Sequence, residues 1–360
     1  MRLTYISICS AESNPGVIKK IGDWAEAASE IGLIPHLKII PPSGGLKAYL
    51  KLNSTILTSK NAILLIRNPS HFRILLFISI FIARVNGCIV IIDVPTPLQT
   101  LTKEILLRKQ NTIFKYFAVL EIIITGSIPF LFAHKIIQYA NEGRWYTLGC
   151  RSKVMLIGNG INLKRIQVRE HFPQWPSNKL ILVGVANVAI WHGYDRIIRA
   201  ISIFNNKVEK PYKVYFNIIG DGPELNNLKQ KVNELKIEEF VLFHGMQSDT
   251  VYIQSVYDNS HLAVSSLALF RKGLNAASDL KSREYVAIGI PFISVGNDID
   301  FLNKIDFRFT LTNSDSIQDI LELFDRLSDL NFPEPLHIRK YAENNLTIVK
   351  KLKLILDSIK

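Results

Sequence analysis

Short runs of β-branched and aliphatic residues alternate along this chain with longer stretches of helical periodicity. This alternation is typical of parallel β-sheets whose strands are joined by crossover helices, so we expect the α/β class. The 360 residues suffice for two such domains. The expected strands are 3–9, 36–40, 62–66, 89–92, 122–125 and 154–157 in the first half, and 180–184, 213–219, 240–245, 262–265 and 291–295 in the second.

The positive charge is confined to the first half. Residues 1–165 hold 20 lysines and arginines against 8 acids, whereas the rest of the chain is balanced at 23 against 23. Apolar runs at 74–83 and 119–133 accompany this charge. Together they favour attraction to an anionic membrane surface or a phosphorylated lipid. Nucleic acid is the competing partner, but no helix-turn-helix, zinc-finger or aromatic RNA-binding signature is present, so we do not expect it.

Three features bear on localisation. The N-terminal residues 1–9 predict a strand and not a signal peptide. The apolar region 74–94 is interrupted by Arg84 and Asp93, so no membrane-spanning segment is expected there. The three cysteines lie far apart and fit a reducing compartment. We therefore expect a cytoplasmic protein, peripheral at the inner face of the cell membrane.

The stretch 271–291, RKGLNAASDLKSREYVAIGIP, concentrates charge and small residues. It predicts a loop that enters a helix near Ser278 or Asp279 and a helix end near Gly289. Exposed N–H groups at a helix start attract anions. Lys281 and Arg283 oppose the helix dipole, so either they bind a phosphate or they belong to a solvated basic helix start.

Five pieces follow one another in the order found in one family. They are IGNGIN (157–162), WHGYDRIIRAI (191–201), IIGDGPELNNLKQ (218–230), FHG (243–245) and RKGLNAASDLKSREYVAIGIPF (271–292). Together they resemble GT-B-fold glycosyltransferases of the GT4 type, which include many enzymes of bacterial surface polysaccharide (capsule and O-antigen) synthesis. The first half resembles the family only weakly. The resemblance implies two Rossmann-like domains facing across a cleft: 1–165 for the acceptor, with a final helix at 337–360 crossing back to it, and 166–336 for the nucleotide-sugar donor.

The resemblance also implies roles for individual residues. Lys281 and Arg196 would neutralise the donor phosphates, and Glu284 would accept hydrogen bonds from the ribose hydroxyls. His192 and Arg196 would occupy the place of the family's basic phosphate-binding pair, and the alternative interpretation is a capping histidine and a surface arginine. The remaining donor-binding candidates are His192, Gly220, Asp221, Gly222, Asn275, Ser282 and Arg271, and the acceptor-side candidates are Gly16, Asp93 and His71.

One departure from the family's pattern qualifies this interpretation, and two other motifs need a separate reading. Ala276 stands where the family's E-x7-E motif has its first glutamate, which puts the sugar identity or activity itself in doubt. The Asp298-Ile299-Asp300 sequence imitates a metal-binding D-x-D, but we interpret it as a pair of loop acids and expect neither a metal nor a cofactor. Leu225 stands where a dinucleotide fingerprint would have its third glycine, which disfavours an NAD-dependent oxidoreductase.

The expected function is therefore a retaining, metal-independent transfer of a sugar from a nucleotide-diphosphate sugar to a hydroxyl of a glycan, lipid-linked at the membrane. The alternative is a non-catalytic partner protein of the same shape in a glycan assembly complex. Ala276 is the feature that favours this alternative.

Overall fold

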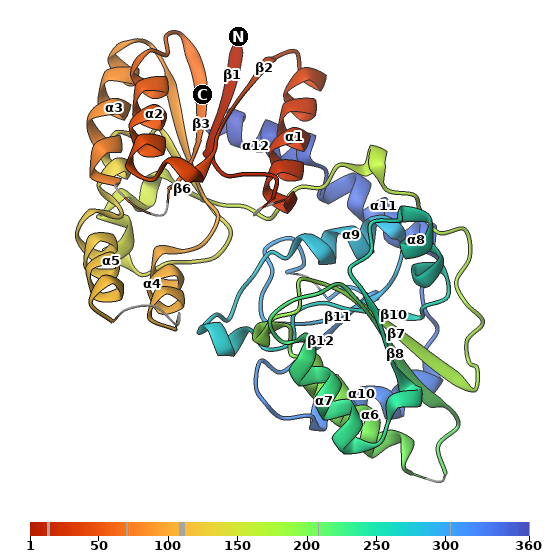
Figure 1. Cartoon of the computed structure of the whole chain (residues 1–360). Helices are drawn as coiled ribbons and strands as arrows, with labels where there is room; N and C mark the ends of the chain where they lie inside the picture. Colours follow the sequence, from red (N-terminus) through yellow and green to blue (C-terminus); the bar gives the residue numbers. More distant parts are fainter. Residues whose placement is uncertain are drawn as a thin grey trace. The chain divides into compact units, whose positions relative to one another are not determined.

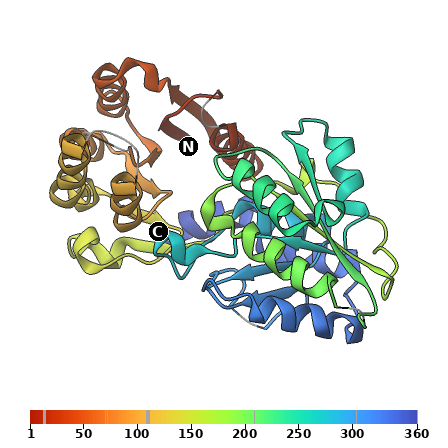
Figure 2. The same ribbon diagram turned by 60° about the horizontal axis from the view of Figure 1, so that its bottom comes forward.

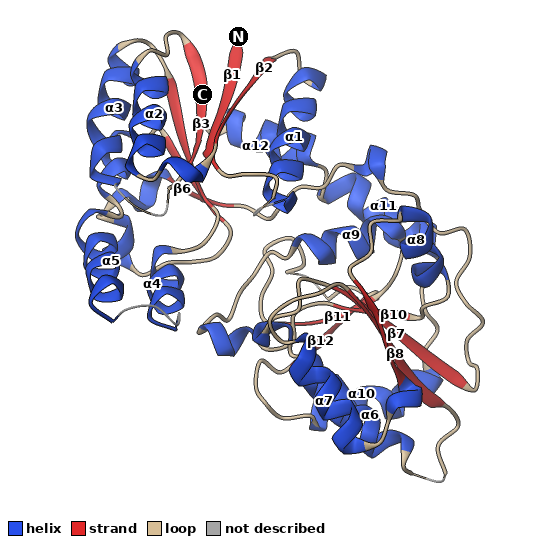
Figure 3. Cartoon of the chain, viewed as in Figure 1, coloured by secondary structure: helices blue, strands red, loops and turns tan. Residues whose placement is uncertain are grey.

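The computed structural model describes all residues except 13, 14, 70, 72, 108–111, 208, 303 and 360. The chain divides into two compact units, Met1–Gly160 with Ile348–Lys360, and Ile161–Thr347. Each unit contains one parallel six-stranded sheet with helices on both faces (Figures 1 and 3). The α/β class and the pairing of two similar α/β domains are confirmed. The loop residues Ser13 and Asn14 of the expected first turn lie outside the described residues.

Unit 1 has the strand order β2-β1-β3-β4-β5-β6. In Figure 1, α1 and α12 cover one face of this sheet and α2 and α3 the other. The strands are β1 (Arg2–Ile8), β2 (Ile34–Ile40), β3 (Ala62–Arg67), β4 (Ile89–Val94), β5 (Lys135–Gln138) and β6 (Val154–Leu156), and the helices are α1 (Pro15–Glu30), α2 (Leu46–Leu57), α3 (Arg73–Val85), α4 (Leu98–Leu107), α5 (Thr112–Thr125) and α12 (Ile348–Asp357).

Unit 2 has the order β12-β11-β10-β7-β8-β9. Helices α6, α7 and α10 lie on one side of its sheet and α8, α9 and α11 on the other, as the turned view in Figure 2 also shows. The strands are β7 (Lys179–Val185), β8 (Lys213–Ile219), β9 (Val241–Gly245), β10 (Leu262–Val264), β11 (Phe292–Val295) and β12 (Arg308–Leu311), and the helices are α6 (Tyr194–Asn205), α7 (Leu225–Leu235), α8 (Thr250–Asp258), α9 (Leu280–Ile288), α10 (Gln318–Arg326) and α11 (Pro335–Asn345).

Two sequence predictions need correction. The run 122–125 is the end of helix α5, and the strand that follows β4 is β5. Ala118, Val119 and Ile122 pack against the core at helical spacing, and this packing overrides the strand preference of the isoleucines. The expected single helix 337–360 is divided into α11, which belongs to unit 2, and α12, which belongs to unit 1.

Helix α12 packs against α1. Ile348, Leu352 and Ile355 are buried in one cluster with Ile21 and Trp24 of α1. The sequence predicted the helical spacing of the three α12 residues, and the structure shows that this face is buried in the first unit.

The helical stretch Ile113–Phe132 is long and apolar enough to cross a membrane by length and composition, with a mean hydropathy of 1.6 over its most apolar window. It comprises α5 and the short 3₁₀ helix Ile128–Phe132. Ile122 and Phe130 are buried in the core of unit 1, but only 28% of the window is buried. Apolar side chains on the other side of α5 are therefore exposed.

Candidate functional site

The candidate donor residues lie on the loops and helices that follow the strands of the unit 2 sheet. All six strands are parallel, so their carboxyl ends meet at the same edge. The chain passes from β7 outward to β8 and β9, then returns to β10 on the opposite side of β7. The connections leaving β7 and β10 thus diverge, and ligands of open α/β sheets bind at such a switch point.

Two of these loops are fixed to each other by backbone hydrogen bonds. Leu267 N donates to His192 O at 2.9 Å, and Ala268 N donates to Trp191 O at 3.1 Å. Gly193 between them has φ +64°, and a Cβ there would lie 3.0 Å from Leu267 and Ala268 atoms. A glycine at this position therefore permits the close approach that places His192 beside the loop after β10.

His192 is a neutral hydrogen-bond donor. Its side chain is buried, and its Nδ1 accepts a hydrogen bond from Ala189 N at 2.9 Å. Burial, together with the charges of Lys281 and Lys272, lowers the pKa of His192 to about 2. Because Nδ1 is an acceptor, the proton of the neutral ring is on Nε2, which can donate to an anion without adding charge.

Lys281 is an unpaired buried cation. It lies in the first turn of α9, and its Nζ is buried without a hydrogen-bond partner among the described residues. Its aromatic neighbour is Tyr194, whose ring centre is 5.8 Å from Nζ. Burial lowers the pKa of Lys281 to about 8, although Asp279 opposes this shift. A buried ammonium without a partner is costly, and an anionic ligand would supply the missing acceptor.

Glu284 lies on the same face of α9 as Lys281, three residues later. It is half-buried, and its charge adds to the burial that raises the pKa of both Tyr257 and Tyr285. Its carboxylate is therefore close enough to these two buried tyrosine hydroxyls to act on their charge. A hydrogen bond to ribose remains a prediction.

The turn Gly220-Asp221-Gly222 after β8 supports the loop that carries His192. A Cβ on Gly220 would lie 1.9 Å from Ala186 O, and one on Gly222 would lie 2.4 Å from Val188 N. Asp221 O accepts from Val188 N at 2.6 Å, and Asp221 Oδ1 accepts from Gly222 N at 2.7 Å. Both glycines are therefore explained by backbone packing, whether or not a base lies above the turn.

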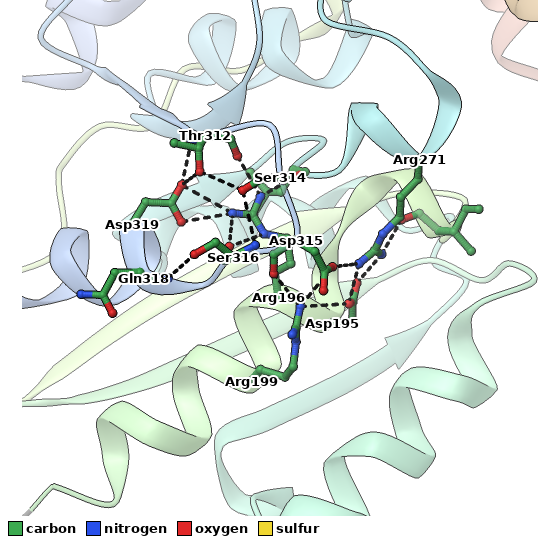
Figure 4. A network of polar contacts seen from close by, with 12 residues as sticks. Asp195, Arg196, Arg199, Arg271, Thr312, Ser314, Asp315, Ser316, Gln318 and Asp319 are labelled. Atoms are coloured by element: carbon green, nitrogen blue, oxygen red, sulfur yellow. Dashed lines mark hydrogen bonds and ion pairs between the residues drawn. The ribbon is translucent and has the colours of Figure 1, made fainter.

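Arg196 is fully buried and has a structural role. Its Nε donates to Ser316 O at 3.0 Å, and its Nη2 pairs with Asp319 at 3.1 Å (Figure 4). Nη1 donates to Thr312 O at 3.2 Å and also to Leu267 O. These bonds tie α6 to the segment before α10 and to the loop after β10, and they engage all three guanidinium nitrogens within unit 2.

Arg271 is also engaged within the protein. Its two terminal nitrogens bind Asp195 at 2.7 and 2.8 Å, and Nη2 binds Asp315 at 2.7 Å (Figure 4). Arg271 follows β10, whereas Asp195 begins α6 after β7. The ion pair of Arg271 with Asp195 is a second link between the segments that flank the switch point.

Arg283 fits neither alternative that the sequence left open, a phosphate ligand or part of a solvated basic helix start. It is fully buried, and its Nη2 binds Asp298 at 2.5 Å and Asp300 at 2.6 Å. The D-x-D sequence is thus a pair of acids that neutralises a buried arginine, in agreement with its interpretation as loop acids.

The other donor candidates make contacts within unit 2. Asn275 Oδ1 accepts from Asn313 at 3.1 Å, and Ser282 Oγ lies 2.8 Å from Ser265 Oγ. Ala276 forms a β-bridge with Asn297. Asn275 and Ala276 therefore lie where the loop after β10 meets the loop after β11.

The acceptor-side candidates all follow strands of unit 1. Gly16 is exposed in the first turn of α1, and His71 is half-buried between β3 and α3. Asp93, at the end of β4, is buried and accepts from Tyr5 Oη at 2.5 Å. Burial raises the pKa of Asp93, but Lys20 and Arg67 outweigh this effect and lower it overall.

Sequence reasoning missed the cations around Asp93. Lys20 donates to Tyr139 Oη at 2.8 Å, and Arg67 Nη1 lies 3.7 Å from Asp93. Arg67 ends a strand of apolar residues and is followed by Asn68. A charged residue at the carboxyl end of a buried strand indicates a candidate binding residue, so Arg67 could have been found from the sequence.

Comparisons with known proteins agree with this arrangement. Residues 167–296 match the family model described as Glycosyl transferases group 1. The alpha-monoglucosyldiacylglycerol synthase of Streptococcus pneumoniae is 30% identical over 115 residues, which is 31% of this chain and 24% of that protein. The match thus spans about a quarter of the curated relative.

Solved structures resemble the chain over its full length. The Anabaena protein HepE in complex with UDP has a TM-score of 0.63 at 12% identity, covering 100% of this chain and 99% of its own. The apo lipopolysaccharide outer core galactosyltransferase WaaB has 0.65 at 12%, covering 99% of each. A glycosyltransferase from Rickettsia africae has 0.64 at 15%, covering 100% and 98%. The chain thus has the two-domain GT-B fold, and residues 167–296 match the family model of group 1 glycosyl transferases.

Proposed function

We propose that this chain is a glycosyltransferase that moves a sugar from a nucleotide-diphosphate sugar to a hydroxyl of a glycan or glycolipid acceptor. One observation above all supports the proposal: the buried Lys281 ammonium has no partner among the described residues and lies at the switch point of a parallel sheet. The group 1 domain, 167–296, contains Lys281, His192 and Glu284.

The proposed reaction retains the configuration of the sugar. The bond from the anomeric carbon to the diphosphate breaks, and a bond to the acceptor oxygen forms on the same face. The departing phosphate takes the proton of the acceptor hydroxyl, so no side chain has to act as the base. Lys281, the Nε2–H of His192 and the N–H groups of the α9 start would stabilise the charge that builds on the phosphate. Glu284 would accept hydrogen bonds from the ribose.

We place the protein in the synthesis of bacterial surface polysaccharide such as capsule or O-antigen, as a GT4-type enzyme that works without a metal, peripheral at the inner face of the cell membrane. The exposed apolar side of α5 supports the location at the membrane. Ile113, Phe114, Phe117 and Ile124 are each at least 58% exposed, and Lys115 lies among them. Aromatic and aliphatic side chains beside a lysine fit the boundary of an anionic bilayer.

Ala276 favours one alternative, a non-catalytic partner protein that keeps the donor pocket. A first experiment separates the two. The full chain is heated with UDP, GDP or dTDP, because a ligand that binds only the folded state raises the midpoint of unfolding, by the equivalent of about 2.7 kcal/mol at a hundred times Kd. We expect one of these three nucleoside diphosphates to raise the midpoint of unfolding.

The matching nucleotide-sugars then test turnover. Slow release of the nucleotide in the absence of acceptor supports the enzyme. Binding without any release or transfer supports the partner protein, and no response to any diphosphate contradicts both.

A further inference from the structure

A cavity of about 410 Å³ lies at the carboxyl edge of the sheet in unit 1. Its walls come from the ends of β1, β3 and β4 and from the helices that follow them. Two arginines, Arg67 and Arg73, line it together with Tyr49, Asn68 and Thr96, and none of its described lining residues is an acid. The cavity therefore has a basic wall.

Arg73 has more hydrogen-bond donors than the structure uses. Its side chain is fully buried, and Nη1 donates to Glu121 Oε2 at 3.1 Å. Its backbone N–H donates to the other oxygen of Glu121 at 3.2 Å. Nε and Nη2 have no hydrogen-bond partner within the described part of the chain. Buried N–H groups of a charged side chain are rarely left unpaired, so these donors indicate a missing acceptor.

Two cations share a single carboxylate beside the cavity. Lys20 and Arg67 both act on the single carboxylate of Asp93 and lower its pKa against the effect of its burial. The carboxylate is also bonded to the Tyr5 hydroxyl at 2.5 Å. Glu121 and Glu142 are the carboxylates that act on Arg73.

The N-terminus of α3 adds to the positive electrostatic potential at the cavity. This helix of 13 residues begins at Arg73, so its positive dipole end is at the cavity wall. A phosphate is the anion that uses these features best, because it can accept several N–H groups at once and pair with a planar guanidinium.

We propose that this cavity binds a phosphate ester carried by the acceptor. The inference rests on the proposed function only in identifying the ligand as the acceptor. The phosphate could belong to a soluble ester or to a lipid headgroup.

The test uses the full chain with Lys281→Met, so that phosphate does not bind at the donor residues. Calorimetry follows the binding of inorganic phosphate and of sn-glycerol 3-phosphate to this parent protein and to three variants of it. Asn68→Asp places a carboxylate in the cavity wall at nearly constant shape, and Arg73→Met removes the unpaired donors. Arg84→Met removes the same charge from the exposed end of α3 and is the matched control.

We expect the parent to bind both ligands, Asn68→Asp and Arg73→Met to bind them at least about tenfold more weakly, and Arg84→Met to bind them unchanged. If Arg73→Met fails to fold, the comparison of the parent with Asn68→Asp still tests the proposal. Equal binding by the parent and Asn68→Asp, or no binding by the parent at millimolar ligand, would overturn the proposal.

Calorimetry with a short-chain, monomeric phosphatidylglycerol identifies the source of the phosphate, because it offers the lipid headgroup without a bilayer for α5 to bind. Binding tighter than that of glycerol phosphate that is lost in Asn68→Asp assigns the phosphate to a lipid headgroup, whereas binding of glycerol phosphate alone assigns it to a soluble ester. The response of the wild-type chain to UDP is recorded separately. Failure of UDP to bind would contradict the proposed function while leaving the phosphate site standing.

Discussion

The ammonium of Lys281 lies 5.8 Å from the centre of the Tyr194 ring, and no described acceptor bonds to it. Tyr194 is itself buried. The two residues come from the helices that follow β10 and β7, the strands that flank the switch point. The fold therefore holds a positive charge in a position that destabilises the free protein, as expected where a site is prepared for an anionic ligand.

Replacing Lys281 by methionine should stabilise the free protein and abolish UDP binding. The substitution removes an unpaired buried charge and keeps most of the side-chain volume. We expect the midpoint of thermal unfolding to rise by roughly 2–4 °C for each kcal/mol gained, with no further rise on adding UDP. Lys340→Met, on the exposed side of α11, is the matched control and should change neither quantity. A variant that binds UDP like the wild type would remove Lys281 from the site.

UDP binding should take up protons above pH 8. The pKa of Lys281 in the free protein is about 8, and a bound diphosphate favours the charged form and raises it. Calorimetry at pH 9 in two buffers of different ionisation enthalpy should show an uptake close to one proton. Because the folded pKa is below the unfolded value of 10.5, the unfolded chain binds more protons between pH 8 and 10.5. This residue therefore makes stability rise with pH across that window. Uptake of no protons at pH 9 contradicts the assignment.

The sequence predicted those features that depend on neighbours in the chain. Strand β8 was placed at its observed bounds, and the end of α9 at Gly289 followed from a glycine that adopts φ +89°. The partners of arginines depend on distant residues instead. Arg196 pairs with Asp319, 123 positions later, and this pairing cannot be read from a local pattern. Lys281 and Arg283 looked equivalent in the sequence, and only the fold shows that one is neutralised and the other is not.

Arg196→Met should destabilise unit 2 and leave UDP affinity nearly unchanged. The variant leaves Asp319 without its cation and Ser316 O without its donor, and breaking such a buried pair costs about 3–5 kcal/mol. The midpoint of unfolding should fall by roughly ten degrees, while UDP binding measured well below it stays within a small factor. Arg199→Met, on the same helix but partly exposed, should cost less than about 1 kcal/mol. Loss of UDP binding without loss of stability would return Arg196 to the donor site.

Glu284→Gln should weaken UDP binding by one to two orders of magnitude, because a hydrogen bond to a charged group contributes about 1.5–3 kcal/mol. The amide keeps the shape of the side chain but replaces one acceptor by a donor. A thermal-shift titration and calorimetry both measure the change, with Glu343→Gln on the exposed face of α11 as control. Comparison of UDP with its 2′,3′-dideoxyribose analogue locates the effect, since the variant should lose affinity for UDP alone. Equal losses for both nucleotides would place Glu284 away from the ribose.

The exposed side of α5 should mediate binding to anionic bilayers. Phe114 and Phe117 are 71% and 68% exposed, and replacing both by serine removes the apolar area that would enter the headgroup region. We expect the wild type to sediment with phosphatidylglycerol vesicles, less with phosphatidylcholine, and the double variant to remain largely in solution. Leu302→Ser, at a site 74% exposed in unit 2, should not alter sedimentation. Salt should weaken but not abolish binding, because screening acts on the lysines and not on the apolar contact. Binding that resists both the double substitution and alkaline carbonate would instead indicate that the stretch 113–132 spans the bilayer.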